Sequence, residues 1–317
     1  MQNDTTSEEV TPKTSRSGRR ILSIGVVLVL VLLLGTFVYI QINRVEMDLS
    51  PLAKFAETES YDALISRVHA KAPGPEEFSF VVLGDTRSAY ERALEILKRA
   101  AAEDPAFILS NGDLGQYGTV EEYLEYHLPL VREIAPLPFI PVPGNHERGP
   151  NHDFAAFKAL YGDERFSFDY GNCRFIGINN SDRPKMGPLD LRYLKRELAK
   201  PGVEHRFVIF HQPPEFVERA VGSQDVRGFA WNAEAFHRLM VEYQVDHVFV
   251  GHIHGFATTV RDGVRYTITG GGGVGLTDTL GEEAKVHHFV LVHVGPDGIR
   301  NEIVKQVDGE WLQVPVK

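Results

Sequence analysis

The stretch Val142-Pro143-Gly144-Asn145-His146-Glu147 follows the apolar run Pro138-Phe139-Ile140 and brings three polar side chains into a turn rich in Pro and Gly. This arrangement is expected where a strand ends and a rigid loop presents reactive groups at the carboxyl edge of a sheet. A Gly-Asn pair is also common in ordinary turns. The rest of the chain therefore has to show whether this loop is a site.

The same arrangement recurs along the chain. Short apolar runs alternate with amphipathic stretches, and five predicted strands end beside a side chain that can bind a metal ion. These are 78–83 with Asp85, 106–109 with Asp113, 138–140 with Asn145, 206–210 with His211, and 246–250 with His252 and His254. Strands that alternate with helices predict a layered α/β fold with a buried central sheet. In a parallel sheet these strand ends converge on one edge.

The intervening stretches predict helices and one hairpin. Helices are expected at 89–102, 119–134, 153–161, from Pro188 onward, and 231–242, and a hairpin joins 166–168 to 173–176. After residue 256 the chain is richer in strand and turn signals. The globular domain is expected to begin near Phe78 and to occupy residues 78–317.

Asp, Asn and His together offer hard oxygen and borderline nitrogen donors, which suit Zn, Mn, Fe or Ni better than Ca. Two ligand sets that share one carboxylate can hold two ions about 3.5–4 Å apart. Such a pair of ions stabilises both the attacking and the leaving oxygen of an in-line displacement. Phosphoryl transfer fits this geometry, because its catalysis consists mainly of positioning and charge neutralisation.

These motifs resemble a known family. Gly84-Asp85, Gly112-Asp113, Gly144-Asn145-His146-Glu147, His211 and Gly251-His252-Ile253-His254 are similar, in order and spacing, to the motifs of the calcineurin-like metallophosphoesterases, over about residues 78–290. Tyr170-Gly171-Asn172, Pro213-Pro214, the glycine run 270–273 and His287-His288-Phe289 further resemble the purple-acid-phosphatase-like branch. The resemblance implies a layered sheet sandwich flanked by helices.

The resemblance also implies a role for each residue of the set. Asp113 would bridge two metal ions, Asp85 and His254 would bind the first ion, and Asn145, His211 and His252 would bind the second. A hydroxide held between the ions would attack phosphorus. His146 would contact the phosphate and protonate the leaving oxygen. Glu147 would hold the loop or His146 in place.

One position departs from the family pattern. Many members read Asp-x-His at the first motif, whereas this chain reads Asp85-Thr86-Arg87. A guanidinium stays protonated and does not coordinate a cation. The first ion is therefore expected to be weakly held or completed by water. Arg87 is expected either to clamp a phosphate oxygen or to form a salt bridge at the sheet edge.

Three further groups are candidates for the site. Some purple-acid-type members supply a tyrosinate three residues after the bridging Asp; this chain has Gln116 there, and Tyr117 follows as a candidate ligand or substrate contact. Three aromatic residues after His211 are candidates to line a substrate cleft: Phe216, Phe229 and Trp231. The glycine run 270–273 predicts either a phosphate cradle or a tight bend.

The composition is that of a globular protein. The chain has 317 residues, of which 43% are hydrophobic and 24% charged, and its formal net charge is −10. This acidic balance argues against a nucleic-acid backbone as the main partner, because such binding depends on Lys and Arg contacts to phosphate. Cys173 is the single cysteine, so an intramolecular disulfide is impossible.

The N-terminal region predicts a membrane anchor. Residues 1–20 form a polar tail, 21–40 is an uncharged apolar run long enough to cross about 30 Å of hydrocarbon, and 41–77 reads as a juxtamembrane connector. Four basic residues precede the apolar run, whereas Arg44 alone follows it closely. This bias predicts a cytoplasmic N-terminus and an extracytoplasmic domain. A cleaved signal peptide is the alternative, although its apolar core is usually shorter.

The sequence thus predicts a membrane-anchored hydrolase of phosphoric esters, a phosphatase or phosphodiesterase with two metal ions (Mn, Zn, Fe or Ni). Arg87 motivates a second hypothesis, a membrane-tethered module that binds metal or phosphate with lost or weak turnover. An envelope nuclease is a third hypothesis, which the acidic composition disfavours.

Overall fold

A computed structural model describes residues 16–72, 74–182 and 185–316, without the side chains of 16–23 and 40. The chain forms two compact units, Met1–Glu46 and Met47–Lys317. The first contains the helix α1 (Arg16–Ile42), whose described apolar side chains, from Ile24 to Tyr39, are exposed. Within the described part of the chain, we find no helix with the length and apolar character that a membrane crossing requires. Residues 1–15 of the predicted tail lie outside the described residues, whereas residues 16–20 belong to α1; in the predicted membrane segment 21–40, the side chains of 21–23 and 40 are not described.

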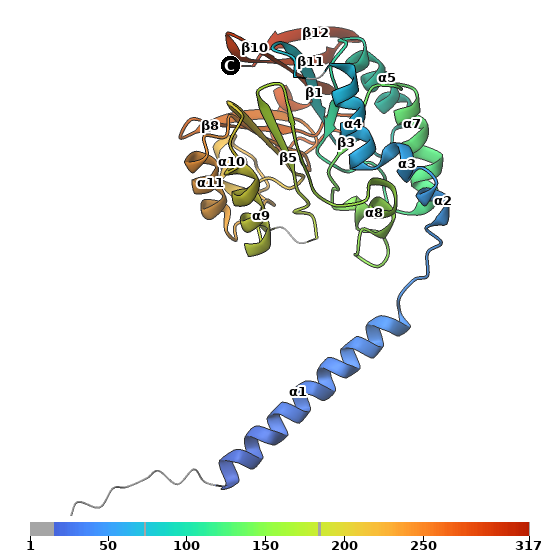
Figure 1. Ribbon diagram of the computed structural model, residues 1–317, viewed down its shortest axis with the longest axis vertical. Coiled ribbons are helices and arrows are strands. Elements are labelled where there is room, and N and C mark those ends of the chain that lie inside the picture. Colours follow the sequence, from blue (N-terminus) through green and yellow to red (C-terminus); the bar gives the residue numbers. More distant parts are fainter. Residues whose placement is uncertain (1–15, 73, 183–184, 317) are drawn as a thin grey trace, which may run out of the picture. The chain divides into compact units, whose positions relative to one another are not determined.

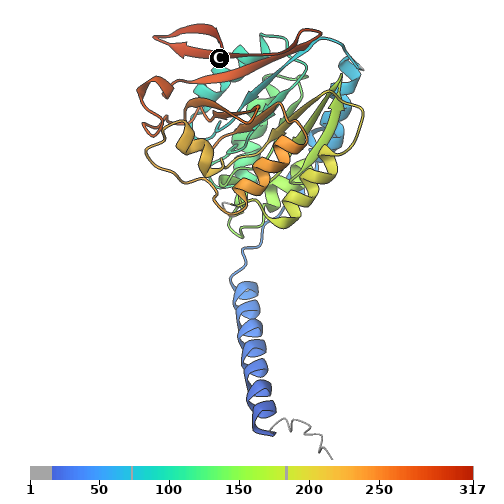
Figure 2. The same ribbon diagram turned by 90° about the vertical axis from the view of Figure 1, so that its left-hand side faces the viewer.

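The second unit is built on two six-stranded sheets (Figures 1 and 2). The first sheet has the order β12 (Glu310–Pro315), β11 (Gly298–Val307), β10 (His288–Gly295), β1 (Phe78–Leu83), β2 (Ile108–Ser110), β3 (Phe139–Pro141). The second has the order β4 (Phe166–Tyr170), β5 (Cys173–Gly177), β6 (His205–Ile209), β7 (His247–Val250), β9 (Val264–Thr269), β8 (Phe256–Arg261). Strands β1, β2 and β3 are parallel, as are β5, β6, β7 and β9, and the remaining pairs are antiparallel.

Helices cover the outer faces of both sheets. In Figure 1, α5 and α7 lie to one side of the strands, and α9, α10 and α11 lie to the other. The bounds are α5 (Tyr90–Ala101), α7 (Leu128–Arg132), α8 (Ala155–Tyr161), α9 (Pro188–Leu198), α10 (Glu215–Ala220) and α11 (Ala233–Glu242). A short helix α6 (Val120–Glu122) and a π-helical turn η1 (Tyr123–His127) lead into α7, and two 3-10 turns are η2 (His146–Arg148) and η3 (Glu282–Ala284).

Aromatic side chains fill the space between the two sheets. Phe80 of β1 contacts the rings of Phe175 and Phe207 edge-on, both at a centroid distance of 5.0 Å. Phe80 and Phe107 are stacked at 5.6 Å. Edge-on and offset-stacked pairs are the preferred arrangements of aromatic rings, and their burial dominates core energetics. The sheets therefore form a rigid sandwich whose loops can hold a site.

The compact unit starts before the predicted boundary near Phe78. Helices α2 (Ser50–Ala53), α3 (Ala56–Glu59) and α4 (Tyr61–Lys71) occupy much of the predicted connector 41–77, and Leu52, Leu64 and Val68 are fully buried in the core. The hydroxyl of Tyr61 donates a hydrogen bond of 2.7 Å to the carbonyl oxygen of Pro141 in β3. The apolar positions of this segment are thus part of the domain core, because they cover the edge near β3 and β4.

The predicted strand ends belong to two sheets. Strands β1, β2 and β3 lead to Asp85, Asp113 and Asn145, while β6 and β7 lead to the three histidines. Because the sheets face each other, the carboxyl ends of both strand sets meet at one side of the sandwich. The sequence-based expectation that all five strand ends lie at the edge of a single sheet is therefore wrong, because they come from two sheets.

Candidate metal centre and active-site cleft

Three predicted ligands adopt left-handed backbone conformations. The φ angles are 60° at Asp85, 58° at Asp113 and 70° at His252. Non-glycine residues adopt this region at a cost, and such strain is typical of functional sites whose surroundings fix the backbone. The sharp turns let each chain segment leave its strand and direct its side chain toward the neighbouring loops. Gly144 allows the close approach, because a Cβ there would lie 2.1 Å from Asp113 Oδ1.

Three donor atoms from different loops converge on Nε2 of His211. Its Nε2 lies 3.1 Å from Asn145 Oδ1, 3.3 Å from Asp113 Oδ1 and 3.3 Å from His252 Nδ1. Donors bound to one ion at about 2.0–2.2 Å are separated by roughly 3.0–3.5 Å when they are adjacent. The spacing of this set therefore fits a single metal ion.

The protonation states of His211 and His252 also indicate a metal site. Nδ1 of His211 faces the carbonyl oxygen of Asn111 at 2.8 Å and must carry a proton, since a carbonyl only accepts. Burial lowers the pKa of His211, and burial together with His211 lowers the pKa of His252 to about 3, so both rings are neutral. The lone pair of His211 Nε2 then faces the amide oxygen of Asn145 and the carboxylate of Asp113. A cation is the species that makes such a contact between electron-pair donors favourable.

A second group of donors lies beside the first. Asp85 Oδ1 is buried, has no hydrogen-bond partner among the described residues, and lies 3.5 Å from His254 Nε2. Nδ1 of His254 donates to the carbonyl oxygen of Gly275 at 2.9 Å, which leaves Nε2 unprotonated when the ring is neutral. Burial and the charge of Asp113 raise the pKa of Asp85 well above its usual range. An unpaired buried carboxylate oxygen is costly, and an ion at this position would remove that cost. Asp85, Asp113 and His211 also offer three ligand atoms within 4.8 Å of one another.

Arg87 stands next to this second group. Its Nε lies 3.3 Å from Asp113 Oδ2, and its Nη2 lies 3.5 Å from His254 Nε2. Nη1 donates to the side chain of Gln116. The first-ion set therefore fits incompletely: Asp85, Asp113 and His254 supply three donors, and a guanidinium occupies the side where the family pattern has a histidine. Tyr117 is 68% exposed and is not among the residues that line the cleft.

His146 and Glu147 have separate tasks in the loop. His146 Nδ1 donates to the carbonyl oxygen of Gln116 at 2.7 Å, while its Nε2 lies 3.8 Å from Asp113 Oδ2 on the side of the cleft. Glu147 is fully buried and accepts four backbone N–H groups at 2.6–3.1 Å, those of Asp113, Leu114, Gly115 and Gly144. Burial and Asp113 raise the pKa of Glu147 to about 8, and hydrogen bonds from the loop oppose this rise. Glu147 thus binds the second and third ligand loops together.

A cleft of about 330 Å³ opens onto these residues. The cleft is lined by predicted site residues, namely Arg87, Asp113, Asn145, His146, His252 and His254. Its other wall was not predicted from the sequence and consists of Asp225, Arg227, Ile253, Thr277 and Thr279.

The aromatic residues that were predicted to line the cleft lie elsewhere. Phe229 is buried in the core of the second sheet, Phe216 packs against that core, and Trp231 is 54% exposed. The glycine run follows β9, and its backbone contacts Gly84, with the N–H of Gly272 donating to the carbonyl oxygen of Gly84 at 2.9 Å.

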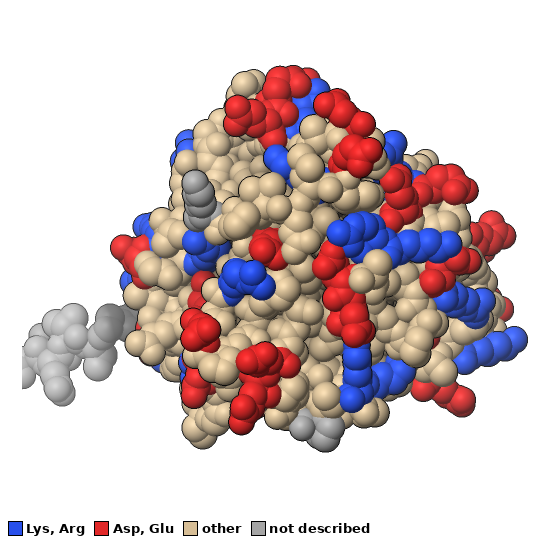
Figure 3. Space-filling model, turned by 90° about the horizontal axis from the view of Figure 1, so that it is seen from above, with Lys and Arg blue, Asp and Glu red and all other residues tan. Residues whose placement is uncertain are grey.

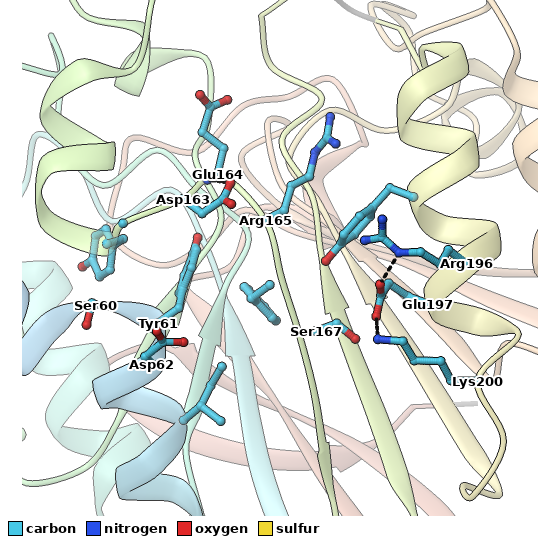
Figure 4. Close-up of a pocket in the computed structure, with 15 residues that line it drawn as sticks. Ser60, Tyr61, Asp62, Asp163, Glu164, Arg165, Ser167, Arg196, Glu197 and Lys200 are labelled. Atoms are coloured by element: carbon cyan, nitrogen blue, oxygen red, sulfur yellow. Dashed lines mark hydrogen bonds and ion pairs between the residues drawn. The ribbon is translucent and has the colours of Figure 1, made fainter.

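A larger cavity of about 870 Å³ lies away from the predicted residues (Figure 4). It is lined by α4, the start of β4 and α9, and contains none of the candidate ligands. Two of its basic residues, Arg196 and Lys200, both pair with Glu197 (Figure 4), and the third, Arg165, pairs with Asp190 at 2.6 Å. The smaller cleft is the better candidate site, because the candidate metal ligands line it and none of them lines the larger cavity. The face shown in Figure 3 carries Asp and Glu among its Lys and Arg side chains, a mixed charge rather than a continuous basic surface.

Comparison with known proteins gives a family and a set of similar folds. The family model described as calcineurin-like phosphoesterase matches residues 78–256. No curated protein sequence matches the chain.

Solved structures share the fold at low sequence identity. The structure described as GAP50, the anchor in the inner membrane complex of Plasmodium, is 16% identical, with a TM-score of 0.60 over 77% of this chain and 90% of that one. Purple acid phosphatase PPD1 from yellow lupin is also 16% identical, with a TM-score of 0.58 over 75% of this chain and 53% of its own. PhoD is 13% identical, with a TM-score of 0.52 over 78% of this chain and 73% of its own.

Proposed function

Because the chain belongs to the calcineurin-like phosphoesterase family, we propose that it is a metal-dependent hydrolase of phosphoric esters. The observation that carries this proposal is the convergence of Asn145 Oδ1, Asp113 Oδ1 and His252 Nδ1 on the unprotonated Nε2 of His211. Purple acid phosphatase and PhoD have similar folds and support the same class of reaction.

In the proposed centre, Asp113 would contribute to the binding of both metal ions. Asn145, His211 and His252 complete the second set, and Asp85 and His254 contribute to the first, weaker set beside Arg87. The ions would be Mn, Zn, Fe or Ni, in keeping with the mixture of carboxylate, amide and imidazole donors. When bound, metal ions supply Lewis-acid polarisation of the phosphoryl group and activation of water.

The chain's own residues carry the remaining steps. Arg87 is held by Asp113 and Gln116 at the cleft and donates N–H groups to a phosphoryl oxygen. The hydrogen bond from Nδ1 of His146 to the carbonyl oxygen of Gln116 orients the ring with Nε2 toward the cleft, so that the imidazolium form can deliver its Nε2 proton to the leaving oxygen and keep the proton on Nδ1. Glu147 keeps both ligand loops in register through its four backbone hydrogen bonds.

A direct assay tests this proposal. The compact unit 47–317 should hydrolyse p-nitrophenyl phosphate or bis-p-nitrophenyl phosphate when it is supplied with Mn, Zn, Fe or Ni, and chelation should abolish the activity. Asp113→Asn is the matched variant, because it keeps the side-chain shape but removes the shared charge. Absence of hydrolysis of both esters with every metal would refute the proposal.

We further propose that residues 21–40 anchor the chain in a bilayer, with the N-terminus cytoplasmic and the catalytic unit extracytoplasmic. The uncharged run and the exposed apolar side chains of α1 support this. The full chain should co-sediment with lipid vesicles, and the double variant Leu30→Arg/Leu33→Arg should not. Equal sedimentation of the two chains would contradict the anchor.

Arg87 favours a second candidate function, a tethered module that binds metal or phosphate without turnover. Its guanidinium stands where the family pattern has a ligand. The structurally similar GAP50 is described as the anchor in the inner membrane complex of Plasmodium. Metal analysis beside the ester assay separates the candidates: bound metal with phosphate binding and no hydrolysis would favour the module.

A further inference from the structure

The unpredicted wall of the cleft carries one arginine, Arg227, in the loop between α10 and α11. Arg227 and Asp225 line the same 330 Å³ cleft as the metal-ligand candidates and His146. The loop has no periodic pattern and no glycine-rich phosphate motif, so the sequence alone does not single it out. Its position follows from contacts that only the folded chain makes.

A buried carboxylate fixes the backbone of Arg227. Glu218 of α10 is fully buried, and its Oε2 accepts the N–H of Arg227 at 2.8 Å. The next residue, Gly228, has no room for a side chain, because a Cβ would lie 2.3 Å from both Glu218 Oε1 and the carbonyl oxygen of Pro213. Such close packing holds the loop in one place.

Backbone hydrogen bonds connect this loop to two ligand segments. The N–H of Phe229 donates to Pro213 O at 3.0 Å, two residues beyond His211. The N–H of Gln224 donates to Thr279 O at 2.9 Å, and the N–H of Thr277 donates to His254 O at 3.0 Å. Arg227 is therefore positioned relative to the metal-ligand loops by the backbone, although its side chain is exposed.

The guanidinium of Arg227 can exchange its carboxylate partner for an anionic ligand. It pairs with Asp225, and the side chains of Arg227 and Asp225 are 73% and 48% exposed. Exposed ion pairs contribute little to stability, so a more highly charged anion in the cleft can replace the carboxylate at low cost. A guanidinium also matches the geometry of a phosphate group with two parallel N–H donors.

We propose that Arg227 binds a second phosphate group of the substrate, so that the preferred substrates are phosphate esters whose leaving group carries a further phosphate. The inference rests on the proposed function. Arg87 and the metal ions engage the phosphoryl group that is transferred, while Arg227 engages the phosphate that stays on the leaving group. Asp225 holds the guanidinium in the absence of substrate.

The test compares two sugar phosphates, glucose 6-phosphate and glucose 1,6-bisphosphate. Phosphate release is measured for the full chain in detergent with the activating metal, and the ratio of the two kcat/KM values is the readout. Arg227→Ala should lower the preference for the bisphosphate roughly ten- to a hundred-fold, the range expected for a lost charge-assisted hydrogen bond. Arg227→Lys should recover part of the preference, because it keeps the charge without the two parallel donors.

Arg219→Ala is the matched control. Arg219 is an exposed arginine of α10 that pairs with Glu215 at 3.3 Å and does not line the cleft, so its removal should leave the ratio unchanged. Asp225→Asn should lower the KM for the bisphosphate, because it releases the guanidinium. The same ratio in Arg227→Ala and Arg219→Ala, with wild-type hydrolysis intact, would overturn this inference alone. Failure of the wild-type chain to hydrolyse any phosphate ester would instead overturn the proposed function.

Discussion

At the scale of single residues, Arg87 decides how the metal centre differs from the family pattern. Its guanidinium contacts the carboxylate proposed as the bridging ligand and the imidazole of His254. A permanent positive charge at this position offsets part of the negative charge of Asp85 and Asp113. Its N–H groups also compete with a metal ion for the lone pairs of Asp113 Oδ2 and His254 Nε2, which they approach at 3.3 Å and 3.5 Å.

Replacement of Arg87 by histidine should strengthen the first metal position. After dialysis, the wild-type chain should retain about one equivalent of metal and Arg87→His close to two, since imidazole supplies a fourth donor. Elemental analysis of both proteins measures this. Arg92→His, on the exposed side of α5, is the control and should retain the wild-type amount. Equal metal content in all three chains would show that Arg87 does not occupy a ligand position.

His146 should matter according to the leaving group. Its Nε2 faces the cleft, while its Nδ1 is committed to the carbonyl oxygen of Gln116. His146→Gln should lower kcat for alkyl phosphates by about 10²–10⁴, the usual contribution of a general acid. The loss should be smaller with p-nitrophenyl phosphate, because nitrophenolate leaves without a proton. A uniform loss for both classes of ester would argue for a role in binding. His152→Gln, outside the cleft, should have no effect.

At the scale of secondary-structure elements, the strand ends combine strain with chemistry. Asp85, Asp113 and His252 leave their strands through left-handed conformations that glycine would adopt without cost. The rigid sheets hold these conformations in place, Glu147 accepts the N–H of Asp113, and Asp85 Oδ2 accepts the N–H of His252. The site is thus maintained at the expense of local stability, as is common for functional residues.

The cost of the left-handed conformation predicts that glycine substitutions at His252 and at His254 change the stability by different amounts. His252→Gly relieves a left-handed residue, whereas His254→Gly does not, since His254 has no positive φ. In the metal-free protein, His252→Gly should therefore be more stable than His254→Gly by about 1 kcal/mol. Chemical denaturation in the presence of a chelator measures the difference. A lower stability for His252→Gly would mean that its side-chain packing outweighs the backbone strain.

The ligand-bearing elements were predictable because their signals are local. β1 was predicted at 78–83 and observed at Phe78–Leu83, since an apolar run followed by Gly-Asp marks both a buried strand and its end. The wall with Arg227 was not predictable, because its position depends on the burial of Glu218 and on pairing with residues about 50 positions away. The six-residue helix α10 was also missed, being too short for helical periodicity to show.

At the scale of the whole molecule, the division into two sheets could not be read from strand order along the chain. β10 enters the first sheet beside β1 although more than 200 residues separate them. The N-terminal boundary was also unclear in the sequence, because the apolar residues of α2–α4 have loose spacing. Only their burial shows that they belong to the core.

Truncation tests the role of these helices. A chain that begins at residue 78 lacks Leu52, Tyr61, Leu64 and Val68, each 5% exposed or less. Burial of each large apolar side chain contributes about 1.5–3 kcal/mol, so their loss is comparable with the stability of a typical domain. The fragment 47–317 should unfold cooperatively on heating, whereas 78–317 should not. Equal melting temperatures for the two fragments would contradict the assignment of α2–α4 to the core.

The hydrogen bond from Tyr61 to Pro141 has a mechanical consequence. Any pull along residues 1–46 enters the domain at Met47 and passes through α2–α4 before it reaches the sheets. Tyr61 transfers this load to β3, the strand that leads directly into Asn145 and His146. Tension on this N-terminal segment would therefore be felt first at the loop that carries the proposed metal ligand Asn145 and the proposed proton donor His146.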